Sequence, residues 1–198
     1  MTTIYLVRHG DKVRESGDVP LTPLGKNEAE KTGKFFLDKN IDLILSSPQK
    51  RALQTAEIIQ KVLKTPPLKV NDLLKERINF GDVSNQGYTQ FLEMVEKSSV
   101  KRDWVLPNGE TSLSCGRRLE SVIPIVALGA FRNIIIATHG GIITDFLRNA
   151  FSMEKLNEKI PAFNLKRETA IKTCSITKLE LDGNELKLIS VGDTSHLV

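Results

Sequence analysis

The stretch IYLVRHGDK, residues 4–12, begins as an apolar run and ends on charged and titratable side chains. Residues 4–7 have the composition of a strand that is buried on both faces of a sheet. Arg8 and His9 follow at once, and Gly10 leaves room there for another backbone to approach closely. Ligands of open α/β sheets bind beyond the carboxyl ends of the strands, so this stretch predicts a strand whose end has a chemical role.

Two further apolar runs, residues 41–45 and 134–137, are each followed by small or polar residues and then by a helical pattern. The segment after the first strand predicts a loop and then a helix within residues 21–40. The segment after the second predicts a helix with Ser47 as its cap and Pro48 at its first position. This alternation of strands and helices predicts an α/β sheet.

The 198 residues suit a single domain, 1–198, that carries an insertion. Residues 66–108 interrupt the alternation with Pro66-Pro67, Gly81 and Gly87, and we place a small helical cap at 77–108, with a helix near 88–98. Near the C-terminus, two alternating segments around Asp182-Gly183-Asn184 predict a hairpin. The expected architecture is a three-layer α/β/α sandwich with a mainly parallel sheet, to which the hairpin adds an antiparallel strand.

Composition argues against several classes of protein. The net charge is only +4, and no dense basic run is interleaved with aromatic residues, so nucleic-acid binding is not expected. Cys115 and Cys174 lack a C-x-x-C partner, which predicts buried free thiols and no zinc cluster. The chain has no apolar run of roughly 18 residues and no signal-peptide pattern, so we expect a cytoplasmic protein without a membrane segment.

Several unusual side chains are expected to meet at one edge of the sheet. Arg51 lies in the first turn of the helix after the second strand, and His139 follows the third strand, ahead of Gly140 and Gly141. His9 and His139 are two of the three histidines in the chain. Because helix N-termini attract anions, these residues together with Arg8 predict a site for an anionic group.

Six pieces of this sequence resemble the histidine phosphatase superfamily, also called phosphoglycerate mutase-like, and they follow one another in the order of that family. They are LVRHGDK, LTPLGKNEAE, SSPQKRALQTAEII, LLKERINFGDVSN, PNGETSLSCGRRL and ATHGGII, spread over most of residues 4–150. The resemblance implies a phosphoglycerate mutase-like fold and a hydrolase that acts on phosphoric monoesters. It also implies a small anionic phosphorylated substrate and catalysis without a metal or other cofactor.

The resemblance assigns His9 as a nucleophile that becomes phosphohistidine, with Arg8, Arg51 and His139 holding the phosphoryl group. This agrees with the chemistry, because an attacking imidazole must be neutral and nearby arginines lower its pKa. Arginine also offers a rigid fork of N–H donors for phosphate oxygens. The resemblance further places four residues at or beside the substrate: Gly10, Thr22, Gly140 and Glu110.

The leaving oxygen needs a proton, and the family takes it from a carboxylic acid just before the insertion. The match here is Glu76 in LLKERINFG, with Asp82 and Asp11 as alternatives, and like charge on a bound phosphate would favour the protonated acid. His196, in GDTSHLV, resembles a tail found in some members, and we expect it to have a structural role.

Phosphatases and mutases of this superfamily share the phosphohistidine. Glycolytic mutases continue Arg-His-Gly as Glu-Ser-x-Trp-Asn, where this chain has Asp-Lys-Val-Arg, and SSPQKRALQTA resembles the phosphatase branch. We therefore predict a phosphomonoesterase, with a mutase-type phosphoryl transferase or an inactive phosphate-binding protein of the same fold as alternatives. A homodimer is left open.

Substrate choice is expected to depend on residues 77–105. The aromatic side chains there either line the site or pack the insertion onto the sheet, and nearby basic residues are candidates for additional anion contacts. The aromatic residues are Phe80, Tyr88, Phe91 and Trp104; the basic residues are Arg14, Arg77, Lys101 and Arg102.

Overall fold

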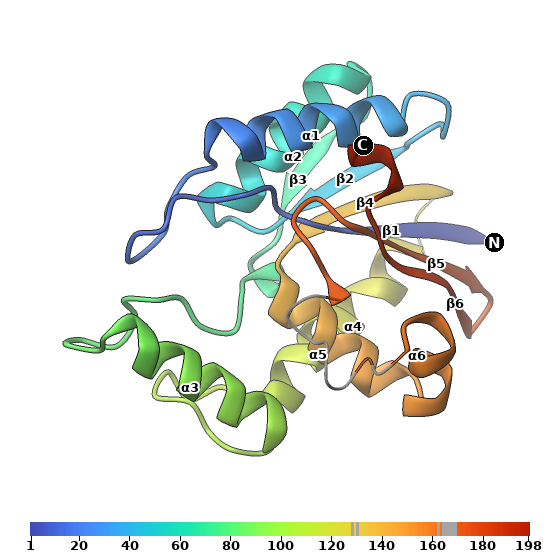
Figure 1. Ribbon diagram of the computed structural model, residues 1–198. Helices are drawn as coiled ribbons and strands as arrows, with labels where there is room; N and C mark the ends of the chain where they lie inside the picture. Colours follow the sequence, from blue (N-terminus) through green and yellow to red (C-terminus); the bar gives the residue numbers. More distant parts are fainter. Residues whose placement is uncertain (128, 130, 162, 164–169) are drawn as a thin grey trace.

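The computed structural model shows one six-stranded sheet with helices on both faces (Figure 1), and it describes residues 1–127, 129, 131–161, 163 and 170–198. In chain order the elements are β1 (Thr2–Arg8), α1 (Pro23–Phe35), β2 (Leu43–Ser46), α2 (Lys50–Leu63), β3 (Leu68–Val70), the 3₁₀-helix η1 (Asp72–Leu74), α3 (Tyr88–Val100), α4 (Ser112–Ala127), β4 (Asn133–Thr138), α5 (Gly140–Ala150), α6 (Met153–Lys159), β5 (Ile176–Asp182), β6 (Glu185–Asp193) and the 3₁₀-helix η2 (Ser195–Leu197).

The strand order is β3-β2-β4-β1-β5-β6, so β1 lies inside the sheet between β4 and β5. β1 pairs in parallel with β4, and Arg8 stands opposite Thr138 at the end of the ladder. The β5–β6 hairpin pairs with the other side of β1 in antiparallel orientation. The carboxyl ends of β1, β2 and β4 therefore lie at the same edge of the sheet.

The helices cover both faces, which confirms the three-layer architecture (Figure 1). Side chains alternate between the two faces of a strand, and β1 follows this rule closely. Ile4 and Leu6 pack in the large core beneath α4, α5 and α6, whereas Tyr5 and Val7 pack against α1 and α2. Burial on both faces explains why residues 4–7 are apolar without interruption.

The segment of residues 77–108, called the cap below, stands beside the sheet and contains α3 (Figure 1). It has a small apolar core of its own around Ile78, Met94 and Leu106. Its two ends are joined where the Asn108 side-chain amide donates to the Arg77 carbonyl at 2.7 Å. The segment also contacts α5, where Arg148 donates to the Ser99 carbonyl at 2.7 Å.

Three local predictions were wrong. The second helix begins at Lys50 with Gln49 as N-cap, because the Ser47 N–H still pairs with the Ala137 carbonyl as a continuation of the sheet. β3 was not predicted, since three residues of a half-exposed edge strand carry little periodic signal. The hairpin adds two antiparallel strands to the sheet and not one.

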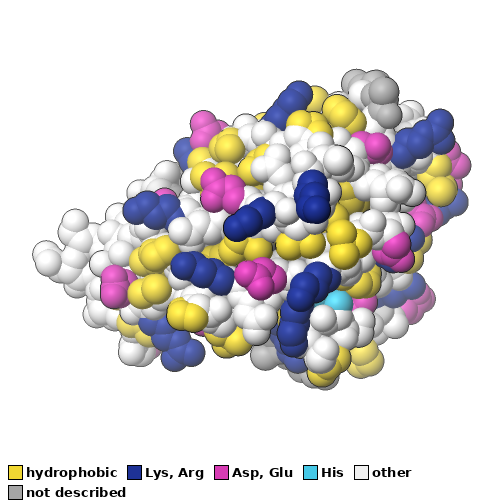
Figure 2. All heavy atoms as spheres, turned by 90° about the horizontal axis from the view of Figure 1, so that it is seen from above, with side chains coloured by type: hydrophobic (Ala, Val, Ile, Leu, Met, Phe, Trp, Pro, Cys, Tyr) yellow, Lys and Arg dark blue, Asp and Glu magenta, His cyan; other side chains and the backbone are white. Residues whose placement is uncertain are grey.

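Other expectations concern the composition. Cys115 and Cys174 are buried free thiols, as predicted. No helix in the described part of the chain is long and apolar enough to cross a membrane. On the face that Figure 2 shows, Lys and Arg side chains are interspersed with Asp, Glu and hydrophobic side chains.

Candidate active site

His9 lies just beyond the end of β1, with its backbone N–H bonded to the Thr138 carbonyl at 2.9 Å and its side chain buried. Its Nδ1 is 2.7 Å from the Gly10 carbonyl oxygen, which can only accept, so Nδ1 carries the proton and Nε2 keeps a lone pair. Burial, and then the charges of Arg8 and Arg51, lower the pKa of His9 well below its usual 6.5. The geometry therefore holds a neutral imidazole whose unprotonated Nε2 has no hydrogen-bond partner among the described residues.

His139 stands at the corresponding end of β4, where it is the N-cap residue of α5. The parallel register of β1 and β4 brings its ring to 5.2 Å from the His9 ring, centroid to centroid. Its Nε2 lies 2.9 Å from the Ser47 hydroxyl, and the side chain is fully buried. Burial and the charge of Arg51 lower the pKa of His139 well below 6.5.

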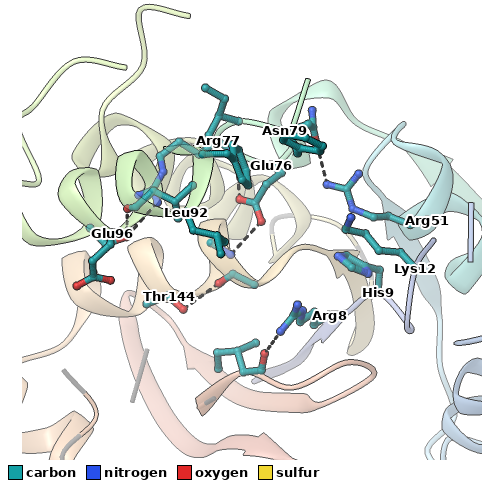
Figure 3. A pocket seen from close by; sticks show the side chains of 18 of the residues that line it. Arg8, His9, Lys12, Arg51, Glu76, Arg77, Asn79, Leu92, Glu96 and Thr144 are labelled. Carbon is teal, nitrogen blue, oxygen red and sulfur yellow. Dashed lines mark hydrogen bonds between the residues drawn. The ribbon is translucent and has the colours of Figure 1, made fainter. Parts of the chain in front are cut away.

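Three cationic side chains stand around His9 (Figure 3). Arg8 donates to the Ile171 carbonyl at 2.5 Å and passes close to Gly140, where a Cβ would lie 3.3 Å from Arg8 Nε. Arg51, also buried, donates to Asn79 Oδ1 at 2.9 Å. Lys12 is half-buried, and burial together with Arg51 and Arg8 lowers its pKa.

His9 and these three cationic side chains form the floor of a pocket of about 350 Å³, and His139 is not among the described residues that line it. At its cationic end the pocket is lined by Arg8, His9, Lys12 and Arg51. Its opposite wall comes from the cap and presents the apolar side chains Ile78, Phe80, Tyr88, Phe91, Leu92 and Val95, together with Arg77, Asn79, Glu96 and Ser99. A molecule with an anionic head and an apolar body matches this division.

Glu76 joins the two ends of the pocket, and its carboxylate reaches the N-terminus of α5 (Figure 3). Oε2 accepts from the Gly141 N–H at 3.0 Å, and Oε1 accepts from Ile142 at 3.1 Å and Arg77 at 2.9 Å. Glycine is required at 141, because a Cβ there would lie 2.5 Å from Glu76 Oε1. Two N–H groups of the first turn of α5 and the Arg77 N–H thus hold this carboxylate.

Comparison with known proteins agrees with this geometry. The family model described as "Histidine phosphatase superfamily (branch 1)" matches residues 4–194. The chain belongs to the histidine phosphatase superfamily. A relative from Bacillus subtilis, named an uncharacterized phosphatase PhoE, is 34% identical over 72% of this chain and 74% of its own.

Two further similarities extend over the full length of this histidine phosphatase. A protein of Hydrogenobacter thermophilus with the provisional name phosphoserine phosphatase 2 is 29% identical over 99% of this chain and 98% of its own. The solved structure of Bacillus stearothermophilus YhfR is 27% identical, covers 100% of both chains and has a TM-score of 0.76. The fold and the phosphatase assignment predicted from the sequence are confirmed.

The alternative acids of this histidine phosphatase lie outside the pocket lining among the described residues. The Asp11 carboxylate accepts from the Thr22 hydroxyl at 2.7 Å, at the start of α1. The Asp82 carboxylate accepts from the Asn79 backbone at 2.7 Å within the cap. Glu76 therefore has the better position for contact with a bound ester.

Other predicted residues support the site from a distance. Thr22 caps α1 by accepting from the Gly25 N–H at 3.1 Å, and Gly10 packs so tightly on Gly25 that a Cβ would collide with its carbonyl. Glu110 binds Arg118 and is not among the described residues that line the pocket. His196 belongs to η2 and packs against α1, where its Nε2 lies 3.1 Å from the Thr32 hydroxyl, as expected of a structural residue.

The basic residues suggested as extra anion contacts are mostly used elsewhere. Arg77 lines the pocket, but its guanidinium forms a buried ion pair with Asp145 at 2.8 Å. Arg102 donates to the Asp145 carbonyl at 2.9 Å, so both arginines fasten the cap to α5. Burial raises the pKa of Asp145 to about 6. Among the aromatic residues, Trp104 packs inside the cap instead of lining the pocket.

Sequence reasoning missed several residues of the site. Lys12 lies within the first motif, but no role was predicted for it, although its position three residues after His9 could have indicated one. Asn79 and Gln49 gave no such signal. Asn79 Oδ1 accepts both from Arg51 and, at 2.8 Å, from Gln49, and it thereby connects α2 to the base of the cap.

Proposed function

We propose that this protein is a phosphomonoesterase in which His9 Nε2 attacks the phosphorus atom of a small phosphorylated metabolite. The P–N bond forms as the P–O bond to the leaving group breaks, which gives phosphohistidine at His9. Water then attacks the phosphorus, the P–N bond breaks, and inorganic phosphate leaves. The observation that carries this proposal is the buried neutral His9, with Nδ1 held by the Gly10 carbonyl and Nε2 free at the cationic floor of the pocket.

The remaining residues have distinct roles in this scheme. Arg8, Arg51 and Lys12 balance the charge of the phosphoryl group as it moves, and the two guanidinium groups also orient its oxygens. His139 lies beside them and contacts the same group. Glu76 gives a proton to the leaving oxygen in the first step and takes one from the attacking water in the second.

The leaving group lies against the apolar wall of the cap in this proposal. Phe80, Tyr88 and Phe91 contact one another there, with ring centroids 5.2 to 6.3 Å apart. An ester with an apolar or aromatic portion would cover this wall, whereas a short polar ester such as phosphoserine would leave it exposed to water. We therefore expect apolar esters to be preferred, and the name of the Hydrogenobacter relative makes phosphoserine the natural comparison.

The test is phosphate release from a panel of esters, with a chelator present, by the wild type, by His9→Ala and by His196→Ala. The panel contains phosphoserine, 3-phosphoglycerate, a sugar phosphate, an alkyl phosphate and an aryl phosphate. We expect chelator-resistant release of phosphate by the wild type and by His196→Ala, because His196 packs against α1. His9→Ala should release none. Rapid quenching with ³²P-labelled ester should trap acid-labile label on the wild type and none on His9→Ala.

Three outcomes would contradict the proposal. Full activity of His9→Ala would exclude the phosphohistidine. Movement of the phosphoryl group between positions of phosphoglycerate, without release of phosphate, would make the protein a mutase. Binding of phosphate without any turnover would mean that the protein is an inactive phosphate-binding protein of the same fold.

A further inference from the structure

The segment that carries Glu76 is held from behind by a side chain of α4. Arg118 Nη1 donates to the Leu73 carbonyl at 2.5 Å, and Nη2 donates to the Lys75 carbonyl at 3.0 Å. The Lys75 carbonyl belongs to the peptide that immediately precedes Glu76. Arg118 therefore holds the backbone at the point where the candidate acid begins.

Arg118 is itself held in place by Glu110. Its Nε donates to Glu110 Oε1 at 2.6 Å and its Nη2 donates to Oε2 at 3.0 Å, which is a two-point contact between planar groups. The two side chains are only 21% and 19% exposed. A paired guanidinium of this kind is more rigid than a solvated arginine, so it can hold the backbone that it contacts in a fixed place.

Two other contacts hold Glu76 from different directions. Gln49 Oε1 accepts from the Glu76 backbone N–H at 2.7 Å, and the carboxylate is bound by the first N–H groups of α5. These contacts fix the backbone nitrogen and the carboxylate. The Arg118 contact fixes the preceding carbonyls and thus the path of the chain into the pocket.

From these contacts we infer that Arg118, oriented by Glu110, is a positioning residue that sets the place of the Glu76 carboxyl relative to the leaving oxygen. This inference rests on the proposed function, in which Glu76 is the acid. The same inference gives Glu110 an indirect role in the site. Glu110 acts through Arg118 and the 73–76 segment, and it does not touch the substrate.

A positioning role differs from a merely structural one in how it depends on the leaving group. An alkoxide needs a proton as it departs, whereas a nitrophenolate departs without one. Misplacing the acid should therefore slow alkyl esters and spare nitrophenyl esters. General loosening of the fold would slow both classes equally.

The experiment measures kcat for an alkyl phosphate and for 4-nitrophenyl phosphate with Arg118→Met, Arg118→Lys and the control Arg117→Met. Arg117 is the exposed neighbour on the same helix. We expect Arg118→Met to lose ~10- to 100-fold on the alkyl ester, the scale of an error of about 1 Å in placement, and less than ~3-fold on the nitrophenyl ester. Arg118→Lys should fall between Arg118→Met and wild type, and Arg117→Met should match wild type.

A double variant completes the test. If Arg118 acts through Glu76, Glu76→Gln/Arg118→Met should be no slower on the alkyl ester than Glu76→Gln, within about 2-fold. Independent, multiplying losses would overturn the inference, as would equal loss on both esters with both Arg118 variants. A Glu76→Gln variant that showed no preference between the two esters would instead overturn the assignment of the acid in the proposed function, and the inference with it.

Discussion

The floor of the pocket and the cap are built on opposite principles. At the floor, His9 and Arg51 are 4% and 3% exposed, with His9 held by the Gly10 carbonyl and Arg51 by Asn79 at the base of the cap. On the cap, Tyr88 is 57% exposed and Leu92 39%, and the rings of Phe80, Tyr88 and Phe91 contact one another. The chemistry is thus fixed by the rigid sheet edge, while contact with the leaving group is left to a small separate unit.

Because of this division, the floor and the cap should respond differently to substitutions. Substitutions at the floor should alter the chemical step for every ester, because the phosphoryl group is common to all of them. Substitutions on the cap should alter the choice between esters. The junction between the two regions is Glu76, which lies directly before the cap and reaches back to α5.

The largest expected effect is at the floor. Arg51→Met should lower kcat/KM by ~10²- to 10³-fold for all esters alike, as expected for loss of one preorganised donor to a group that changes charge. Arg51→Lys should remain well below wild type, because a lysine lacks the two-point fork.

The matched control for that measurement is Arg14→Met, since Arg14 is exposed and is not among the described residues that line the pocket. Steady-state kinetics on the ester panel provides the data. A loss confined to one class of ester would contradict the division between floor and cap.

A smaller effect is expected on the cap. Phe91→Ala should reduce kcat/KM by ~10-fold for aryl esters, through lost burial of apolar surface, and by much less for methyl phosphate. Inhibition by inorganic phosphate should stay unchanged, because phosphate contacts only the floor. Because Phe91 also packs on the core of the cap, the exposed Leu92→Ala serves as a second variant, and unchanged ester preference in both would contradict the assignment of the wall.

The smallest expected effect concerns stability. The pKa values of His9 and His139 are lowered in the folded protein, so below pH 6.5 the unfolded chain binds more protons at these positions. The free energy of unfolding should therefore fall as pH drops, by up to about 1.4 kcal/mol for each histidine between about pH 7.5 and 5.5.

Urea unfolding of wild type and His9→Gln at both pH values measures this contribution. Asp145 acts in the opposite sense, because its raised pKa of about 6 lets the folded state bind more protons than the unfolded chain between pH 3.8 and about 6. Its contribution is the same in both proteins and cancels in the comparison. An identical pH dependence in the two proteins would show that His9 is not buried as a neutral imidazole.

The buried strands of the sheet and most of the residues at the floor could be predicted from sequence. Continuous apolar runs that end on Arg8, His9 and His139 identify buried parallel strands, and the ends of such strands meet at one edge. Arg51 could be placed by its position near the start of a helix. These predictions succeeded because each depends on local pattern and on a general property of α/β sheets.

Predictions that depended on the direction of a single side chain were less complete. Glu110 was expected beside the substrate, yet its carboxylate binds Arg118. Arg77 and Arg102 were candidates for additional anion contacts in the pocket, yet they bind α5. No local pattern determines whether an arginine faces a ligand or a neighbouring helix.

The sequence by itself determined the α/β sandwich, the histidine and arginine side chains at its edge, and the family. Strand burial and helix starts leave marks within a few residues, so they can be recognised without coordinates. Only the tertiary structure decided that Glu76 reaches α5, that the cap supplies an apolar wall, and that Arg118 supports the acid. Those contacts join residues 43 to 66 positions apart, and their geometry exists only once the sheet and its helices have packed.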